Sequence, residues 1–384
     1  MNIGVDIRSL MVKNKTGIGE YTFELLSAIF KEDKDNNYFL FSNSFKKTDK
    51  NLLIWSQPNV YFISIRYPNK FVNLALALGL INVNQLLPEK IDIWYSPNIN
   101  FLSLNKQTKH ILTIHDISFE LFPEFNTFKQ RLWHKLVNPK KQCQEANIIV
   151  VPSENTKRDL IQYYQIEENK ILVIYPGISP NFDVSEPKLK LQKTIIQKKY
   201  DLPENFILFL GSIEPRKNLL GLIKAFEKLP KHLSDKFHLL IAGGSGWKNK
   251  LVYECANSSK LRDHIKFLGY VADADKPALL AQANLFVFPS FYEGFGFPII
   301  EAMKIGTPVI TGNRSSLPEV SNNAAYYINP NNVSELTIAM KLILENSKLY
   351  EEYIKRGSEL ASKYNWNESA KKHLQILTTN QKTQ

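Results

Sequence analysis

The chain has 384 residues, of which 44% are hydrophobic and 12% aromatic, and its formal net charge is +11. This length predicts two domains of nearly equal size, with enough apolar residues for two cores. Nucleic acid is excluded as the expected partner, because no recognition motif accompanies the positive charge. The two cysteines, Cys143 and Cys255, are far apart and have no metal-like spacing, so they predict inert thiols in a reduced, cytosolic compartment.

Short apolar runs rich in β-branched and aromatic residues recur along the chain and predict strands. In chain order, the predicted strands of the first half are 2–7, 37–42, 60–65, 91–96, 110–116, 147–153 and 171–177. Those of the second half are 205–212, 238–244, 265–270, 285–290, 308–312 and 324–329. Amphipathic stretches between them predict helices, as at 19–32, 216–229 and 333–347. The chain opens directly on its first strand, which predicts that no signal peptide precedes it.

Continuous apolar strands that alternate with helices indicate parallel sheets covered on both faces. The pattern occurs twice, so the sequence predicts an α/β protein with two doubly wound, Rossmann-like domains. The polar, charged stretch 179–204 is the expected boundary. We therefore expect a first domain over 1–182 and a second over 183–364, followed by a C-terminal helix within 365–384.

Two segments bear on membrane contact. Several asparagines and a glutamine interrupt the apolar run 71–87, which favours one amphipathic helix over a transmembrane span. The segment 129–142 combines basic residues with Leu132, Trp133, Leu136 and Val137. It fits either a helix at the surface of an anionic membrane or an ordinary helix whose apolar stripe faces the core.

The most informative stretch is 289–308, where an apolar strand runs into the loop Glu293-Gly294-Phe295-Gly296 and then into a helix that starts at Pro298. Proline suits the first turn of a helix, and the glycines leave the backbone N–H groups open to a ligand. These N–H groups and the helix N-terminus favour an anion. Glu301 is expected in the first turn. Two acids around an anion site predict a ligand rich in hydroxyls, such as a sugar nucleotide.

Three further motifs follow predicted strands. In GSIEPRKN (211–218), Arg216 and Lys217 stand at a helix start, where cations are unfavourable unless an anion binds nearby; a solvent-facing pair is the alternative. TGIGEYT (16–22) contains Gly17 and Gly19 but lacks the third glycine of a dinucleotide fingerprint. The Asp273-Ala274-Asp275 triplet is explained by helix N-capping, so we expect no metal site there.

Together these motifs resemble the retaining glycosyltransferases of family 4, which have the GT-B fold of two domains facing a central cleft. The match includes EGFGFPIIEAMKIGTPVI (293–310), GSIEPRKN, IAGGSGW (241–247), FLGYV (267–271), TGIGEYT and IHD (114–116), in the order that the family uses. The resemblance implies that the C-terminal helix crosses back to the first domain. It also implies that the donor is held mainly by the second domain.

The resemblance implies donor-binding roles for residues of the second half. Arg216 and Lys217 would bind the diphosphate, although relatives often carry an arginine where this chain has Ser212. Glu301 would accept hydrogen bonds from the ribose, and Glu293 would contact the transferred sugar. The remaining expected donor contacts are Tyr270, Val271 and the backbone N–H groups of Phe295, Gly296 and Phe297.

Residues of the first half would complete the site by the same resemblance. His115 would reach the donor sugar and act with Glu293 in catalysis, and Asp116 would orient His115 or its loop. Gly17 and Gly19 would lie against the diphosphate and the acceptor.

The resulting hypothesis is transfer of a hexose from a nucleotide sugar to a glycan or lipid-linked glycan acceptor, with retention of configuration. The 115–126 context and the EPRKN variant resemble mannosyltransferases of bacterial surface polysaccharide synthesis, which favours GDP-mannose as donor. We expect no cofactor, no divalent metal and a cytoplasmic enzyme that contacts the inner face of the membrane. A sugar-nucleotide epimerase or phosphorylase on a similar fold is the alternative; a polyanion-binding module or an NAD-dependent dehydrogenase fits less of the pattern.

Overall fold

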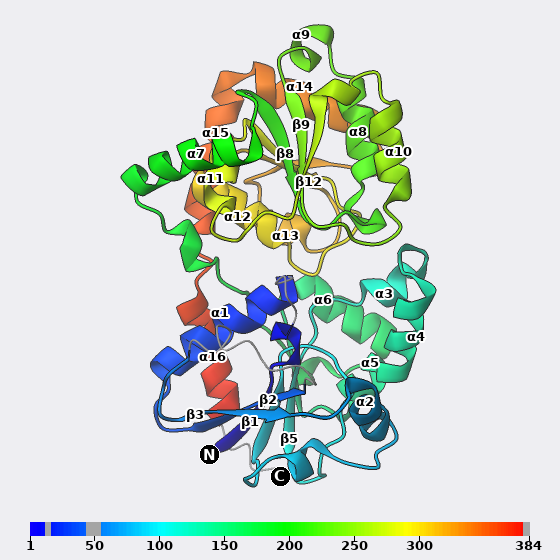
Figure 1. The fold of residues 1–384 in the computed structure, drawn as a ribbon, viewed down its shortest axis with the longest axis vertical. Coiled ribbons are helices and arrows are strands. Elements are labelled where there is room, and N and C mark those ends of the chain that lie inside the picture. The colour runs from blue at the N-terminus through cyan, green and yellow to red at the C-terminus, as the bar shows by residue number, and fades with distance from the viewer. Residues whose placement is uncertain (12–16, 44–54, 379–384) are drawn as a thin grey trace. The chain divides into compact units, whose positions relative to one another are not determined.

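The structure, a computed structural model, describes residues 1–11, 17–43 and 55–378. The chain forms two compact units (Figure 1). The first unit comprises the described residues of Met1–Ile117 and Phe128–Gly177 and the segment that begins at Asn365. The second comprises Ser118–Thr127 and Ile178–Tyr364.

The first unit is built on a parallel seven-stranded sheet with the order β3-β2-β1-β4-β5-β6-β7. Its strands are β1 (Asn2–Asp6), β2 (Asn37–Asn43), β3 (Val60–Ile65), β4 (Ile93–Ser96), β5 (Lys109–Thr113), β6 (Ile148–Val151) and β7 (Ile171–Val173). The central strands are apolar along their whole length because helices cover both faces of the sheet. All four residues of β6, for example, are buried.

One face of this sheet is covered by α1 (Gly17–Glu32), whose Phe30 ring lies 4.8 Å from the ring of Tyr38 in β2. The C-terminal helix α16 (Trp366–Thr378) packs against α1, where the hydroxyl of Tyr21 lies 3.2 Å from Nε2 of His373. Both helices are therefore part of the first unit.

The opposite face is covered by α2 (Asn69–Ala77). Successive strand residues point to opposite faces, so Phe39 and Phe41 face away from α1 and form a cluster with Val72 and Leu76 of α2. The other helical segments of the unit are η1 (Arg8–Leu10), η3 (Val83–Leu86), α4 (Phe128–Val137), α5 (Pro139–Glu145), α6 (Glu154–Asp159), η5 (Leu160–Tyr164) and η6 (Glu168–Lys170).

The second unit has a parallel six-stranded sheet with the order β10-β9-β8-β11-β12-β13. Its strands are β8 (Phe206–Leu210), β9 (His238–Ala242), β10 (Ile265–Gly269), β11 (Leu285–Phe288), β12 (Val309–Gly312) and β13 (Tyr326–Ile328). β8 and β11 lie at the centre and all their residues are buried. The predicted α/β class with two doubly wound, Rossmann-like domains is thus confirmed, since both sheets have a doubly wound order.

The helices of the second unit enclose a single large core. They are α3 (Ser118–Leu121), η4 (Pro123–Phe125), η7 (Pro180–Phe182), α7 (Glu186–Tyr200), η8 (Pro215–Lys217), α8 (Leu219–Glu227), α9 (Lys231–Ser234), α10 (Lys250–Ser258), η9 (Arg262–His264), α11 (Lys276–Leu280), α12 (Phe297–Ile305), α13 (Leu317–Ser321), α14 (Val333–Glu345) and α15 (Ser347–Ala361). Residues Ser118–Thr127 lie early in the chain but pack here, with the Phe125 ring 5.7 Å from the Phe291 ring.

Two segments differ from their predicted form. The run 71–87 is not one helix, because α2 ends before Gly79, whose φ of +67° is the left-handed conformation that terminates helices. The segment 129–142 divides into α4 and α5 at Asn138, whose side chain accepts a hydrogen bond from the N–H of Lys141 and caps α5. The expected boundary stretch 179–204 contains α7, a helix with one buried residue, Ile196.

No helix among the described residues is long and apolar enough to cross a membrane.

Candidate functional site

The site in the second unit begins with two loops at the carboxyl ends of β8 and β9. The N–H of Gly211 donates to the carbonyl of Ala242, and the N–H of Ile213 donates to the carbonyl of Gly244. The two backbones approach so closely that a Cβ on Gly243, which has φ +151°, would lie 1.8 Å from the carbonyl oxygen of Gly211. Only glycine fits there, and the approach fixes the path of the chain into η8.

The short helix η8 presents the basic pair. Asn218, in the left-handed conformation with φ +57°, ends η8 and starts α8. Its side-chain amide donates to the carbonyls of Pro289 (3.2 Å) and Pro330 (2.7 Å), which ties this corner to the end of β11. Arg216 and Lys217 are therefore held on a rigid turn at the carboxyl edge of the sheet.

The second half of the site is the loop between β11 and α12. Gly296 precedes α12 with φ +103°, a conformation that favours glycine. The hydroxyl of Ser316 donates to the carbonyls of Glu293 (2.9 Å) and Phe295 (3.1 Å), and the N–H of Glu293 donates to Oγ of Ser315. This bracing determines where the Glu293 side chain lies.

The position expected for Glu301 was wrong by one turn. Because α12 begins at Phe297, Glu301 is its fifth residue and lies in the second turn, where it is buried. The glutamate near the α12 N-terminus is thus Glu293 on the loop.

Four charged side chains meet at this edge of the sheet. Lys217 Nζ lies 2.6 Å from Glu293 Oε1, and Arg216 Nη1 lies 2.7 Å from Glu293 Oε2. The other arm of Arg216 donates to Glu214 Oε1 at 2.8 Å. Arg216 also donates to the carbonyl of Tyr292, at 2.7 Å. We call Glu214, Arg216, Lys217 and Glu293 the charged cluster.

The two cations keep Glu293 ionised. Burial alone would raise the pKa of Glu293, but the positive charges of Arg216 and Lys217 bring that pKa down to about 2. Burial and Arg216 lower the pKa of Lys217, against the opposing effect of Glu293 and Glu214. Two carboxylates balance two cations, so an incoming anion can replace Glu293 as the partner of the cations. The cluster is chemically suited to binding a phosphate by such an exchange.

The other donor-binding candidates of this unit lie at the same edge of the sheet. Tyr270 and Val271 directly follow β10, and Val271 is buried whereas Tyr270 is exposed. Phe295 is buried against Phe297 and Tyr364, with ring centroids 5.1 Å and 5.5 Å away. The structure thus brings Arg216, Lys217 and Glu293 into direct contact. It places Phe295 and Gly296 on the Glu293 loop, Phe297 and Glu301 in α12, and Tyr270 and Val271 after β10.

The candidates in the first half of the chain belong to the first unit. His115 and Asp116 follow β5, and Nε2 of His115 lies 2.9 Å from the carbonyl oxygen of Pro97. A carbonyl only accepts, so Nε2 carries the ring proton. Burial lowers the pKa of His115, against the effects of Pro97 and Asp116, which favours a neutral ring. Gly17 and Gly19 lie in the first turn of α1, and Thr16 of the same motif is outside the described residues.

The capping explanation for Asp273 and Asp275 was wrong. Asp275 precedes α11 but makes no side-chain cap. Its carboxylate accepts hydrogen bonds from Lys199 (2.6 Å) and Tyr200 (2.7 Å), and Asp273 pairs with Lys276 at 2.8 Å. Among the described residues, no group of three or more His, Cys, Asp or Glu side chains is arranged to hold a metal ion.

Comparison with known proteins assigns the family. The model "Glycosyltransferase Family 4" matches residues 17–182, and "Glycosyl transferases group 1" matches residues 192–360. The O-antigen chain mannosyltransferase B of Escherichia coli is 31% identical over 268 residues, which cover 70% of this chain and 69% of that protein. The chain belongs to the family 4 glycosyltransferases.

Two further comparisons extend over more of the glycosyltransferase. The O-antigen chain mannosyltransferase RfbU of Salmonella typhimurium is 27% identical over 356 residues, 87% of this chain and 89% of that protein. The crystal structure of Anabaena Alr3699/HepE in complex with UDP and glucose superimposes with a TM-score of 0.73 at 18% identity, covering 98% of this chain and 99% of that chain. The resemblance to the GT-B fold is therefore confirmed.

Sequence reasoning missed several residues that shape the site of this glycosyltransferase. Glu214 stands within the GSIEPRKN motif, and an acid two residues before an arginine was an available signal. Ser315 and Ser316 had a weaker one: they follow β12, the strand next to β11, and so lie at the same sheet edge. The role of Asn218 could have been suspected from its position before a helix.

Glu214 leads to a first prediction. Its side chain is almost fully buried and pairs with Arg216, so Glu214→Gln should weaken the contact that holds one arm of the guanidinium. We expect the kcat/KM for glycosyl transfer to fall about 10- to 100-fold, because a hydrogen bond to a charged group contributes about 1.5–3 kcal/mol. Steady-state kinetics should show the loss mainly as a higher KM for the donor. The exposed Glu204→Gln is the matched control, and equal kinetics for both variants would contradict a positioning role.

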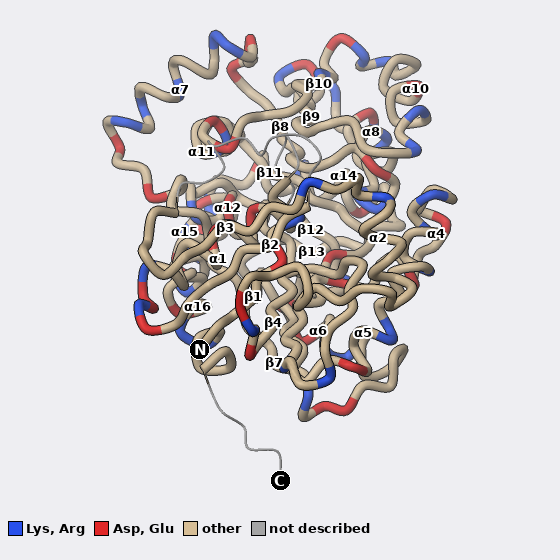
Figure 2. Tube along the Cα trace, turned by 60° about the horizontal axis from the view of Figure 1, so that its bottom comes forward, with Lys and Arg blue, Asp and Glu red and all other residues tan. Residues whose placement is uncertain are grey.

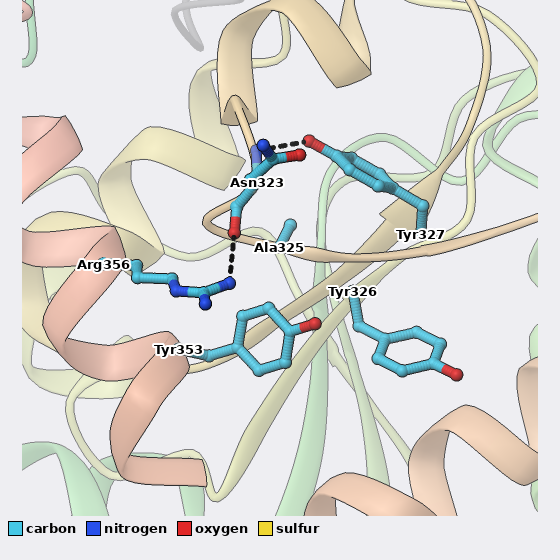
Figure 3. Close-up of a pocket in the computed structure, with 6 residues that line it drawn as sticks. All are labelled: Asn323, Ala325, Tyr326, Tyr327, Tyr353 and Arg356. Atoms are coloured by element: carbon cyan, nitrogen blue, oxygen red, sulfur yellow. Dashed lines mark hydrogen bonds between the residues drawn. The ribbon is translucent and has the colours of Figure 1, made fainter. Parts of the chain in front are cut away.

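The glycosyltransferase also has a shallow hollow of about 390 Å³, lined by Asn323, Ala325, Tyr326, Tyr327, Tyr353 and Arg356. The Tyr327 hydroxyl accepts a hydrogen bond from the N–H of Asn323, and Arg356 donates to the Asn323 carbonyl (Figure 3). Asn323 precedes β13, so the hollow is at the amino end of this strand. The charged cluster is at the carboxyl ends of the strands, and the hollow is therefore not part of the candidate site.

Proposed function

We propose that the protein transfers mannose from GDP-mannose to a hydroxyl group of a glycan or lipid-linked glycan, with retention of the anomeric configuration. The observation that supports this most strongly is the charged cluster, in which the buried Lys217 and the partly buried Arg216 converge on Glu293 at the carboxyl edge of the second sheet. The similarity to O-antigen mannosyltransferases supports mannose as the sugar.

In this proposal the diphosphate of the donor binds Arg216 and Lys217. Glu293 then turns from a partner of the cations into a contact of the transferred sugar. Its negative charge stabilises the positive charge that develops at the anomeric carbon as the bond to the diphosphate breaks. The cations stabilise the departing diphosphate, and the proton of the acceptor hydroxyl moves to it on the same face of the sugar.

Three groups complete the proposed site. Glu301 accepts hydrogen bonds from the ribose, and the N–H groups of Phe295, Gly296 and Phe297 hold the phosphate and the sugar. His115 contacts the sugar as a neutral hydrogen-bond acceptor, and Asp116, Gly17 and Gly19 support this contact. No cofactor or metal takes part, and the enzyme works in the cytoplasm.

A thermal-shift screen tests the donor. GDP-mannose, GDP-glucose, UDP-glucose, ADP-glucose and TDP-glucose are each added at saturating concentration. A true donor at about 100 times its Kd adds about 2.7 kcal/mol to the free energy of unfolding. We expect GDP-mannose to raise Tm the most, equally in the presence of EDTA. A larger shift with another nucleotide sugar, or dependence on a divalent ion, would overturn the proposed donor or the metal-independent chemistry.

A donor-only incubation separates transfer from epimerisation. NMR of GDP-mannose incubated with the protein should show no change in the sugar configuration, whereas an epimerase would convert it without an acceptor. In a transfer product, the mannose should keep the α configuration. A β-linked product would contradict the retaining mechanism.

A further inference from the structure

Helix α4 exposes an apolar stripe to solvent. Phe128, Leu132 and Leu136 are spaced four residues apart and so lie on one side of the helix, and 73%, 45% and 58% of their surfaces are exposed. Val137 is the one buried residue of this helix. The sequence left open whether this stripe faces the core or a membrane, and the structure places it outside the core.

Cations surround this stripe without any intervening acid. Between Phe128 and Gln144 the chain contains no Asp or Glu. The exposed basic residues of α4 and α5 are Lys129, Arg131, Lys135, Lys140 and Lys141, of which Lys141 pairs with Glu145 at the end of α5. Figure 2 shows that basic positions also recur on α7 and α10, where acidic positions accompany them. Helix α4 differs from α7 and α10 in having no acidic residue within its bounds, whereas α7 contains Glu186 and α10 contains Glu254.

Helix α2 repeats the arrangement on the same face of the sheet. Its residues Val72 and Leu76 face the core, whereas Phe71, Leu74 and Leu78 are exposed. Arg66 and Lys70 are exposed beside them, and the chain has no acid between Arg66 and Pro88.

The segment at Phe101 joins α2 to α4. Phe101 packs against the core cluster that contains Val72 and Leu76, and its ring lies 6.1 Å from the ring of Trp133 on α4. Both views show α2 and α4 as neighbours on this side of the first unit (Figures 1 and 2). We call the exposed residues of α2 and α4, with their flanking cations, the basic apolar face.

We propose that the basic apolar face docks on the surface of an anionic phospholipid bilayer. Charge complementarity identifies the occupant: apolar side chains enter the interface while the surrounding lysines and arginines meet phosphate headgroups. A second copy of the chain is a poor fit, because a twofold interface would place the same cations against each other. This proposal is independent of sugar transfer, since binding to lipid needs no donor.

Vesicle sedimentation tests the proposal with the full chain. The protein is mixed with vesicles of phosphatidylcholine alone or with an equal mixture of phosphatidylcholine and phosphatidylglycerol. We expect binding to the anionic vesicles alone, weakened but not abolished by high salt, because the apolar contacts are not screened. Equal binding to both kinds of vesicle, or to neither, would overturn the proposal.

Two sets of variants locate the surface. Lys129→Gln/Arg131→Gln/Lys135→Gln should weaken binding to anionic vesicles about 100-fold, since each cation near such a surface contributes about fivefold. Phe128→Ser/Leu132→Ser should weaken it about tenfold or more through lost apolar burial.

The matched controls lie on α7, whose Leu191 and Ile195 are similarly exposed. Leu191→Ser/Ile195→Ser and Lys188→Gln/Lys190→Gln/Lys198→Gln should bind vesicles like the unchanged protein. Equal losses in the α4 and α7 variants would overturn the assignment to the basic apolar face. Light scattering in the absence of lipid gives a separate check: a dimer that Phe128→Ser/Leu132→Ser dissociates would show that a second copy occupies this face.

Discussion

Glu293→Gln should abolish most sugar transfer while leaving the binding of GDP intact or tighter. The glutamine keeps the shape of the side chain but removes the charge that would stabilise the transition state, so we expect kcat to fall by about 10²–10³-fold. The same change releases Arg216 and Lys217 from their carboxylate partner. Both cations then become more available to a diphosphate, which has to displace Glu293 in the unchanged protein.

The stability of this variant should reveal the same competition. Without the Glu293 charge, the buried Lys217 and the partly buried Arg216 each lose a carboxylate partner, so the free energy of unfolding should drop. The pKa of Glu293 is about 2 in the folded protein and 4.5 in the reference state, which corresponds to about 3 kcal/mol at neutral pH. A carboxyl group whose pKa is lower in the folded than in the unfolded protein stabilises the fold at every pH above its unfolded pKa. The difference between the two proteins should therefore be full near pH 7 and shrink as pH falls from 4.5 towards 2.

Three measurements check this prediction: transfer kinetics, GDP binding by calorimetry and chemical unfolding across pH. The exposed Glu227→Gln is the control for removing a negative charge from the second unit. A variant that loses GDP binding together with turnover would show that Glu293 shapes the phosphate site. One that keeps its activity would remove Glu293 from the catalytic machinery.

Much of this fold could be predicted because its signals are local. Each predicted strand corresponds to a strand of the structure, since apolar runs between turn residues are specific for buried parallel strands. The failures were also local in origin. Gly79 and the Asn138-Pro139 pair are helix-ending and helix-starting signals that were available in 71–87 and 129–142. Helix α7 was missed because lysines dominate it and a single residue, Ile196, is buried.

The residues of the site that lie within one sequence motif could be predicted. The contacts that form only when distant segments pack together could not. Arg216, Lys217 and Glu293 were singled out from motifs that follow strands, and parallel strands bring such loops to one edge. The pairing of Arg216 with Glu214 depends on the backbone conformation of η8, which the local amino-acid sequence does not specify. The bracing of Glu293 by Ser316 crosses from β11 to the loop after β12, a contact between distant segments.

Lys217→Met should lose the binding of the diphosphate, whereas Glu293→Gln should keep it and lose turnover. Lys217 is buried, with its Nζ 4.9 Å from the ring centroid of Phe288, so methionine fills much of the same space. Removal of the charge should lower kcat/KM by about 10²–10³-fold and weaken GDP binding. Lys217→Arg should not restore activity, because a planar guanidinium does not replace a compact ammonium in a fitted site. The exposed Lys224→Met on α8 is the control.

The double variant Lys217→Met/Glu293→Gln separates folding from function. Each single change leaves a buried charge with fewer partners, whereas the double change removes both ends of one ion pair and should recover part of the lost stability. Transfer should remain lost, because both the diphosphate contact and the carboxylate are absent. If the stability loss of the double variant equalled the sum of the two single losses, Lys217 and Glu293 would contribute to stability independently. Recovery of stability without activity would support a role for the 2.6 Å contact between Lys217 and Glu293 in the ligand-free protein. In the donor-bound protein, by the same proposal, Lys217 binds the diphosphate and Glu293 binds the sugar.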